Sequence, residues 1–125
     1  MIKYGVLAAT LVVGLMASSG NAQADGDVAK GKTVFKKCAI CHSVEKGKNK
    51  IGPSLFGIFG TKAGDVEGFR FSPAMKKSGL TWDEATLDKY LTNPRKVVKG
   101  TRMVFAGLRS KKDRENVIAY LKSLK

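Results

Sequence analysis

The strongest constraint on this chain is the pentapeptide Cys38-Ala39-Ile40-Cys41-His42. Two cysteines separated by two residues and followed at once by histidine form the attachment motif of a c-type haem. Cysteines at this spacing lie about one helical turn apart, so both sulfur atoms can face one flat ligand and each can bond a vinyl group. His42 is the only histidine of the chain and can reach the iron from the same side. The motif predicts one haem c per chain, bonded to Cys38 and Cys41, with His42 as an iron ligand.

Two other kinds of site also use closely spaced cysteines. A thiol–disulfide redox pair of the thioredoxin type is expected in a βαβ context, which this sequence lacks. A zinc site needs two further cysteine or histidine ligands, and the chain holds two cysteines and one histidine in all. The haem interpretation is therefore favoured over both alternatives.

The first 24 residues have the pattern of a secretory signal. Lys3 precedes an apolar run from Gly5 to Met16, and a short polar stretch then ends in Ala22-Gln23-Ala24. An A-x-A sequence after such a run is typical of signal cleavage, and the run is short for a bilayer span. We expect residues 1–24 to be removed after Ala24 and residues 25–125 to form one periplasmic domain. Retention of the segment as a membrane anchor is the alternative.

Basic residues dominate the predicted mature domain. The full sequence carries a formal charge of +13, and loss of Lys3 with the signal leaves +12 before haem is added. Such a surface attracts acidic proteins and, less specifically, nucleic acid or anionic membrane. Because an exported protein rarely meets nucleic acid, we expect an acidic protein partner and no nucleic acid.

The spacing of apolar residues predicts an all-α fold. Four segments have helical spacing: Asp27–Lys37, Ser72–Lys77, Thr81–Asn93 and Ser110–Leu124. Ser72 and Ser110 are predicted N-caps, and Thr81 with Glu84 has the spacing of a capping box. The segments 43–70 and 96–109 are predicted loops, and no strand pattern competes. The chain thus predicts three main helices, one short helix and long loops.

Two methionines of the predicted domain are candidates for the second axial position of the iron. Met103 lies in a predicted loop, where the backbone can bend over a haem face, whereas Met75 lies in the short helix. Methionine is usually a flexible core residue. Spacing alone therefore leaves open whether Met103 is a ligand or packs in the core.

Over nearly the whole predicted domain, the sequence resembles the class I cytochromes c, the group of bacterial cytochromes c2 and mitochondrial cytochromes c. The order and spacing of several short motifs carry this resemblance. Besides the pentapeptide they are Gly31–Phe35, Ile51–Leu55, Gly79–Trp82, Tyr90–Pro94, Gly100–Gly107 and Ile118–Lys122.

The resemblance implies a small cytochrome c fold around the haem, with Met103 as the second axial ligand. Pro53 would offer its carbonyl to the His42 ring and so fix the orientation of that ring; otherwise it is simply a turn residue. Three further residues would place polar groups near the methionine sulfur or a haem propionate, or would simply pack in the core: Trp82, Tyr90 and Thr101. Gly31 and Phe35 would contact the last helix.

The sequence also departs from the mitochondrial pattern at three positions near the haem. Phe71 stands where those proteins have a tyrosine that bonds a propionate, and Thr61 where they have an arginine near the same group. Met75 stands where they have an asparagine in the haem crevice. The first two changes would favour ferric haem, and the third would disfavour it.

Six basic residues match positions that ring the exposed haem edge in the family: Lys37, Lys50, Arg95, Lys96, Arg102 and Arg109. A run of charges is often only a solvated face, but a ring at this edge would steer acidic partners toward it.

The function implied is that of a soluble, monomeric, periplasmic one-electron carrier. It would take electrons from a bc1-type complex and pass them to a terminal oxidase or a photosynthetic reaction centre. Because no bond is made or broken, the chain is not expected to be an enzyme. A haem peroxidase would need an open iron site with distal acid and base groups. A gas-binding protein of the cytochrome c′ type would carry its attachment motif near the C-terminus.

Overall fold

The computed structural model describes residues 11–14 and 26–125. Most of the predicted signal segment, with its cleavage site after Ala24, lies outside the described residues. The described chain contains these helices: α1 (Val28–Val34), a 3-10 turn η1 (Phe35–Lys37), α2 (Pro73–Lys77), α3 (Glu84–Thr92), α4 (Pro94–Val97) and α5 (Lys111–Ser123). Within that part there is no strand, only an isolated bridge between Lys62 and Thr81. No helix among these residues has the length and apolar character to cross a membrane. The prediction of an all-α fold is confirmed.

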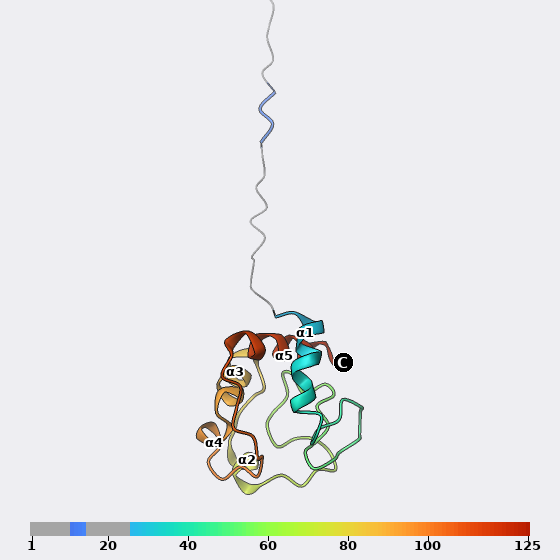
Figure 1. Ribbon diagram of the computed structural model, residues 1–125, viewed down its shortest axis with the longest axis vertical. Coiled ribbons are helices and arrows are strands. Elements are labelled where there is room, and N and C mark those ends of the chain that lie inside the picture. The colour runs from blue at the N-terminus through green and yellow to red at the C-terminus, as the bar shows by residue number, and fades with distance from the viewer. Residues whose placement is uncertain (1–10, 15–25) are drawn as a thin grey trace, which may run out of the picture.

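Helices α1 and α5 lie against each other near the two ends of the described domain (Figure 1). Gly31 permits this approach, because a Cβ atom there would overlap the Asn116 carbonyl and lie 2.8 Å from the Cβ atom of Tyr120. The rings of Phe35 and Tyr120 pack with centroids 5.3 Å apart. The buried Asn116 side chain also accepts a hydrogen bond from the Asp27 backbone at 2.8 Å. The predicted contact of Gly31 and Phe35 with the last helix is confirmed.

The N-caps explain where the predicted helices begin. Ser72 accepts a hydrogen bond from the Met75 backbone, and Ser110 accepts one from the Asp113 backbone, as predicted. The predicted capping box at Thr81 is wrong, because α3 begins two residues later with Asp83 as its N-cap. Asp83 accepts from the Thr86 backbone at 2.8 Å, while Thr81 lies in the bridge to Lys62. The tertiary bridge holds Thr81 in extended backbone, so the later carboxylate takes the capping role.

The loop that was predicted to begin at Lys96 begins only after Val97, because a short helix precedes it. Asn93 ends α3 and is extended, with φ −159°. Its side chain accepts from the Lys96 backbone and starts a second short helix, α4, with Pro94 at its first position. Proline is favoured there because its missing N–H would have no helical partner. The prediction that Asn93-Pro94 ends a helix is confirmed, but α4 was not predicted.

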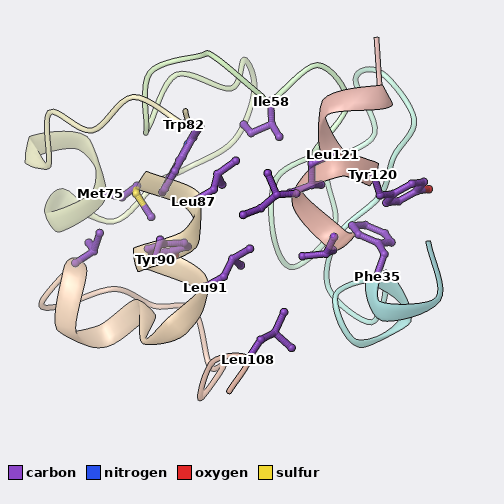
Figure 2. Close-up of a cluster of buried hydrophobic side chains, with 13 residues drawn as sticks. Phe35, Ile58, Met75, Trp82, Leu87, Tyr90, Leu91, Leu108, Tyr120 and Leu121 are labelled. Atoms are coloured by element: carbon purple, nitrogen blue, oxygen red, sulfur yellow. The ribbon is translucent and has the colours of Figure 1, made fainter. Parts of the chain in front are cut away.

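The buried core brings the helices together from both halves of the chain. Figure 2 shows Phe35 and Tyr120 on one side of this cluster, with Met75, Trp82 and Tyr90 on the other. Leu87 and Leu91 on α3 and Leu121 on α5 are also buried in it. The long segments without helix, 43–72 and 98–110, close around the same core.

Replacement of Gly31 tests the close crossing of α1 and α5. At an uncrowded helical position Gly→Ala stabilises a protein by about 1 kcal/mol. Gly31→Ala should instead reduce the free energy of unfolding of the haem-loaded protein by about 1–3 kcal/mol, because the added methyl group overpacks the crossing. Denaturant unfolding measures the difference, with the exposed Lys32→Ala as a control that should change stability by less than about 0.5 kcal/mol. A stabilised Gly31→Ala variant would contradict the crossing.

Candidate haem site

One cavity of about 570 Å³ lies among the core residues. Its walls come from η1, α2, α3, α5 and the long loops. All the residues that were predicted to hold or surround the haem line it: Cys38, Cys41, His42, Pro53, Trp82, Tyr90, Thr101 and Met103. The fold therefore gathers into one site residues that lie up to 65 positions apart in the sequence.

The pentapeptide forms a tight turn directly after η1. The Cys38 carbonyl accepts hydrogen bonds from the backbone of Cys41 at 3.1 Å and of His42 at 2.9 Å. This turn brings both half-buried thiols and the imidazole to the cavity wall. Burial raises the pKa of the Cys38 thiol, and Lys37 offsets part of that rise.

A backbone carbonyl fixes the orientation of the His42 ring. Its Nδ1 atom lies 2.7 Å from the Pro53 carbonyl oxygen. Because a carbonyl can only accept, Nδ1 carries the hydrogen and Nε2 keeps its lone pair. Burial lowers the pKa of the ring, and the hydrogen bond to Pro53 opposes this shift. The ring is therefore neutral at neutral pH, which is the form that binds a metal.

Gly52 gives the imidazole its space. A Cβ atom at this position would lie 2.7 Å from Nδ1 and 2.9 Å from Nε2 of His42. Sequence reasoning placed Gly52 in a family motif but did not assign it this contact.

Polar groups orient the Met103 sulfur. The Tyr90 hydroxyl donates a hydrogen bond to Sδ at 3.2 Å, and the Met103 backbone donates one to the Thr101 hydroxyl at 3.2 Å. Burial raises the pKa of the Tyr90 phenol, so the hydroxyl remains a donor at neutral pH; the Thr101 hydroxyl opposes part of that rise. The Trp82 ring packs on the Tyr90 ring with centroids 4.8 Å apart. One lone pair of the sulfur thus accepts the hydrogen bond, and the other remains available to bind a metal.

Only part of the predicted basic ring lies at the cavity. Lys37 and Arg102 line it, together with Arg70, which sequence reasoning did not select. The Lys50 ammonium donates to the Ala39 carbonyl at 2.8 Å, so it lies beside the pentapeptide. The other three residues are exposed but do not line the cavity: Arg95, Lys96 and Arg109.

Of the three positions that depart from the mitochondrial pattern, two line the cavity and one does not. Phe71 and Met75 line the cavity. Thr61 does not, and its hydroxyl donates to the Ile58 carbonyl at 2.7 Å.

Comparison with known proteins identifies the family. The cytochrome c family model matches residues 28–125. Cytochrome c2 of Rhodomicrobium vannielii is 53% identical over 121 residues, which cover 96% of this chain and 93% of that protein. Cytochrome c of Gibberella zeae is 52% identical over 101 residues, which cover 79% of this chain and 95% of that protein. The chain belongs to the cytochrome c family.

A solved structure supports the same assignment. Cytochrome cH from Methylobacterium extorquens superposes with a TM-score of 0.75 at 48% identity, over 78% of this chain and 99% of that one. As a member of the family, this cytochrome is an electron-transfer protein with covalently bound haem c, and it is not an enzyme.

The residues of the cavity fit that cofactor. Two thiols for thioether bonds, a neutral imidazole with Nε2 available and a thioether sulfur all line one cavity whose other walls are largely apolar. Imidazole and methionine sulfur are the axial ligands typical of c-type electron carriers.

Gly52→Ala tests the space around the imidazole. The added methyl group should push the His42 ring away from the Pro53 carbonyl and reduce the free energy of unfolding of the haem-loaded cytochrome by about 1–3 kcal/mol. Denaturant unfolding should show the loss, whereas Lys46→Ala in the same loop should behave like the parent protein. Equal stability of Gly52→Ala and the parent would show that the ring is not confined by this glycine.

Proposed function

We propose that this cytochrome is a soluble, monomeric, periplasmic carrier of single electrons. It would receive them from a bc1-type complex and deliver them to a terminal oxidase or a photosynthetic reaction centre. The observation that carries the proposal is the convergence of Cys38, Cys41, His42 and Met103 on one cavity. Export to the periplasm rests on the signal pattern of residues 1–24.

In this proposal the chain holds the cofactor and limits what it can do. Cys38 and Cys41 would form the thioether bonds, and His42 and Met103 would be the axial ligands. The bound haem supplies an iron that alternates between the ferrous and ferric states by one electron. With both axial positions filled by its own side chains, the chain would keep substrates from the metal and would permit only electron transfer.

The surrounding side chains would hold that ligand set in place. The Pro53 carbonyl keeps the His42 ring in one tautomer and orientation. The Tyr90 hydroxyl donates to the Met103 sulfur and would make that sulfur a weaker donor to ferric iron. The Trp82 ring packs against the Tyr90 ring and limits its movement. These contacts would keep the geometry similar in both redox states, which favours fast electron transfer.

The basic residues near the cavity would guide partners to it. Lys37, Arg70 and Arg102 line the cavity and are exposed. Complementary charge accelerates encounter without requiring tight binding, and a carrier must leave its partner quickly. We therefore propose that acidic surfaces of membrane redox complexes dock over this cavity, with Lys50, Arg95, Lys96 and Arg109 extending the positive surface around it.

The assignment of Met103 can be tested against Met75. Met103→Ala should lower the redox potential and allow azide to bind the ferric protein, because an axial position is opened. Met75→Leu should do neither, because a buried methionine tolerates a change that conserves its volume. Absorption titration with azide and a potentiometric titration measure both effects. Azide binding by Met75→Leu but not by Met103→Ala would reverse the assignment.

The docking surface can be tested by reversal of charge. Attraction between exposed charges is screened over about 8 Å at physiological salt, so oxidation of the reduced cytochrome by an acidic partner should slow as salt rises. At low salt, Lys37→Glu and Arg102→Glu should react more slowly than the parent protein, and their rates should depend less on salt. Stopped-flow kinetics over a range of salt concentrations measure both effects.

Lys122→Glu is the matched control, because it changes the net charge equally. Lys122 lies on α5 with its ammonium over the Phe59 ring and does not line the cavity. If Lys122→Glu slows the reaction as much as Lys37→Glu does, net charge rather than a local surface governs encounter.

A further inference from the structure

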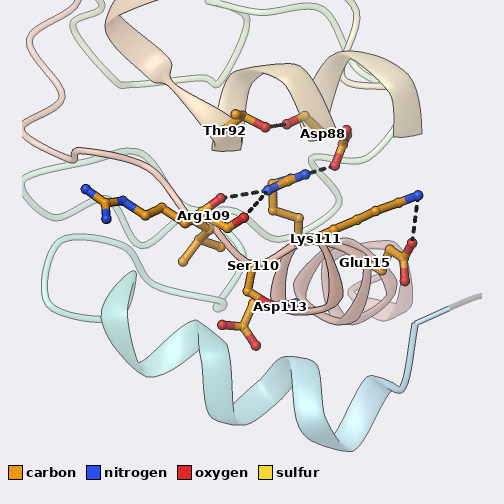
Figure 3. Close-up of polar contacts among 9 residues, drawn as sticks. Asp88, Thr92, Arg109, Ser110, Lys111, Asp113 and Glu115 are labelled. Atoms are coloured by element: carbon orange, nitrogen blue, oxygen red, sulfur yellow. Dashed lines mark hydrogen bonds and ion pairs between the residues drawn. The ribbon is translucent and has the colours of Figure 1, made fainter.

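Arg114 on α5 joins three parts of the fold through one partly buried guanidinium group. Its Nε atom donates to the Asp88 carboxylate on α3 at 2.8 Å. Its Nη1 atom donates to the Leu108 carbonyl at 2.8 Å and to the Arg109 carbonyl at 3.0 Å. The side chain of Arg114 is 11% exposed, against 42% for that of Asp88. Figure 3 shows Asp88 and the Arg109 carbonyl converging on this group, which we call the Arg114 anchor.

The two carbonyls lie at the end of the segment that carries Met103. Residues 98–110 contain no helix or strand. Hydrogen bonds within the segment hold its first part, from the Thr101 backbone to the Val98 carbonyl and from the Met103 backbone to the Thr101 hydroxyl, whereas its second part is held by contacts with other elements. The Leu108 backbone also donates to the Leu91 carbonyl on α3 at 2.7 Å. Gly107 passes so close to the Thr92 carbonyl that a Cβ atom would overlap it. The segment is thus fixed at residues 107–109, four to six residues after Met103.

The positive charge of the Arg114 guanidinium group strengthens its hydrogen bonds. A guanidinium group has only donors, in a planar fork, and here the fork reaches a carboxylate and two carbonyls together. Hydrogen bonds from a charged donor are stronger than neutral ones. Helix α3 carries both Asp88 and Tyr90, and the Tyr90 hydroxyl donates to the Met103 sulfur. The anchor therefore ties the end of the Met103 segment to the same helix that orients the sulfur.

We propose that Arg114 and Asp88 are positioning residues for Met103, which keep its segment closed over the cavity and disfavour the replacement of the sulfur by other ligands. This inference rests on the proposed role of Met103 as an axial ligand. Neither residue lines the cavity, so both would act only through the backbone of residues 107–109.

The test is the azide affinity of the ferric, haem-loaded cytochrome. Asp88→Ala removes the carboxylate and leaves the two carbonyl contacts. Because the carboxylate is partly exposed, we expect azide to bind about twofold to fivefold more tightly in this variant. The weak ferric absorption band that reports methionine ligation should fall at correspondingly lower azide concentrations. Arg114→Lys keeps the charge but loses the fork, and it should show an increase in affinity of the same sign.

Glu115→Ala is the matched control on α5. It removes one negative charge and an ion pair to Lys111 at 3.9 Å that does not touch the Met103 segment, so azide affinity should remain that of the parent. If Asp88→Ala and Arg114→Lys lower the denaturant midpoint yet bind azide like Glu115→Ala, their role is only structural and the inference is overturned.

Met103→Ala separates this inference from the function on which it rests. Strong azide binding by Met103→Ala, with no change in Asp88→Ala or Arg114→Lys, overturns the positioning role alone. Parent-like azide binding by Met103→Ala overturns both the positioning role and the assignment of Met103 as a ligand.

Discussion

The structure depends on the filling of one apolar cavity. Phe35, Leu87 and Leu121 belong to the buried core and also line the cavity. Burial of a Leu or Phe side chain contributes about 1.5–3 kcal/mol, while a whole domain is stable by only about 5–15 kcal/mol. If water rather than a flat apolar group faced several of these side chains, much of that margin would be lost. The bound haem would thus complete the core, with residues of η1, α2, α3 and α5 packed against it.

The proposed ligands differ in how they are held: His42 mainly by contacts that are local in the sequence, and Met103 by more distant ones. Cys38, Cys41 and His42 are fixed by the hydrogen bonds of a single turn. Met103 lies in a segment without regular structure and depends on Tyr90 and, through residues 107–109, on the Arg114 anchor. Arg102, at the proposed docking surface, directly precedes Met103. The proposed docking and the proposed positioning of the sulfur therefore concern neighbouring residues.

Features set by local chemistry could be predicted from the sequence. The pentapeptide indicated the haem, and Ser72 and Ser110 marked two helix starts correctly. Features set by tertiary contacts could not be predicted in this way. The bridge of Thr81 to Lys62 moved the start of α3 to Asp83, and Asn93 began α4 by capping a helix that has no periodic pattern. The Met103 assignment needed the family resemblance, because spacing alone did not separate it from Met75. The contacts of Asn116 with Asp27 and of Arg114 with Asp88 join residues 89 and 26 positions apart, and the contact of Gly52 with His42 depends on the path of a loop. A polar residue within an apolar helical face, as at Asn116, is nevertheless a sequence signal for such a contact.

The most direct test of Met103 as the second iron ligand is a proton NMR spectrum of the reduced, haem-loaded protein. A methyl group held against a haem face is shifted far upfield by the ring current of the porphyrin. If Met103 lies against the haem face, one methionine methyl signal should appear at such a position, disappear in Met103→Leu and persist in Met75→Leu. A spectrum with no upfield methionine methyl, or one that disappears only in Met75→Leu, would contradict the proposal that Met103 completes the iron site.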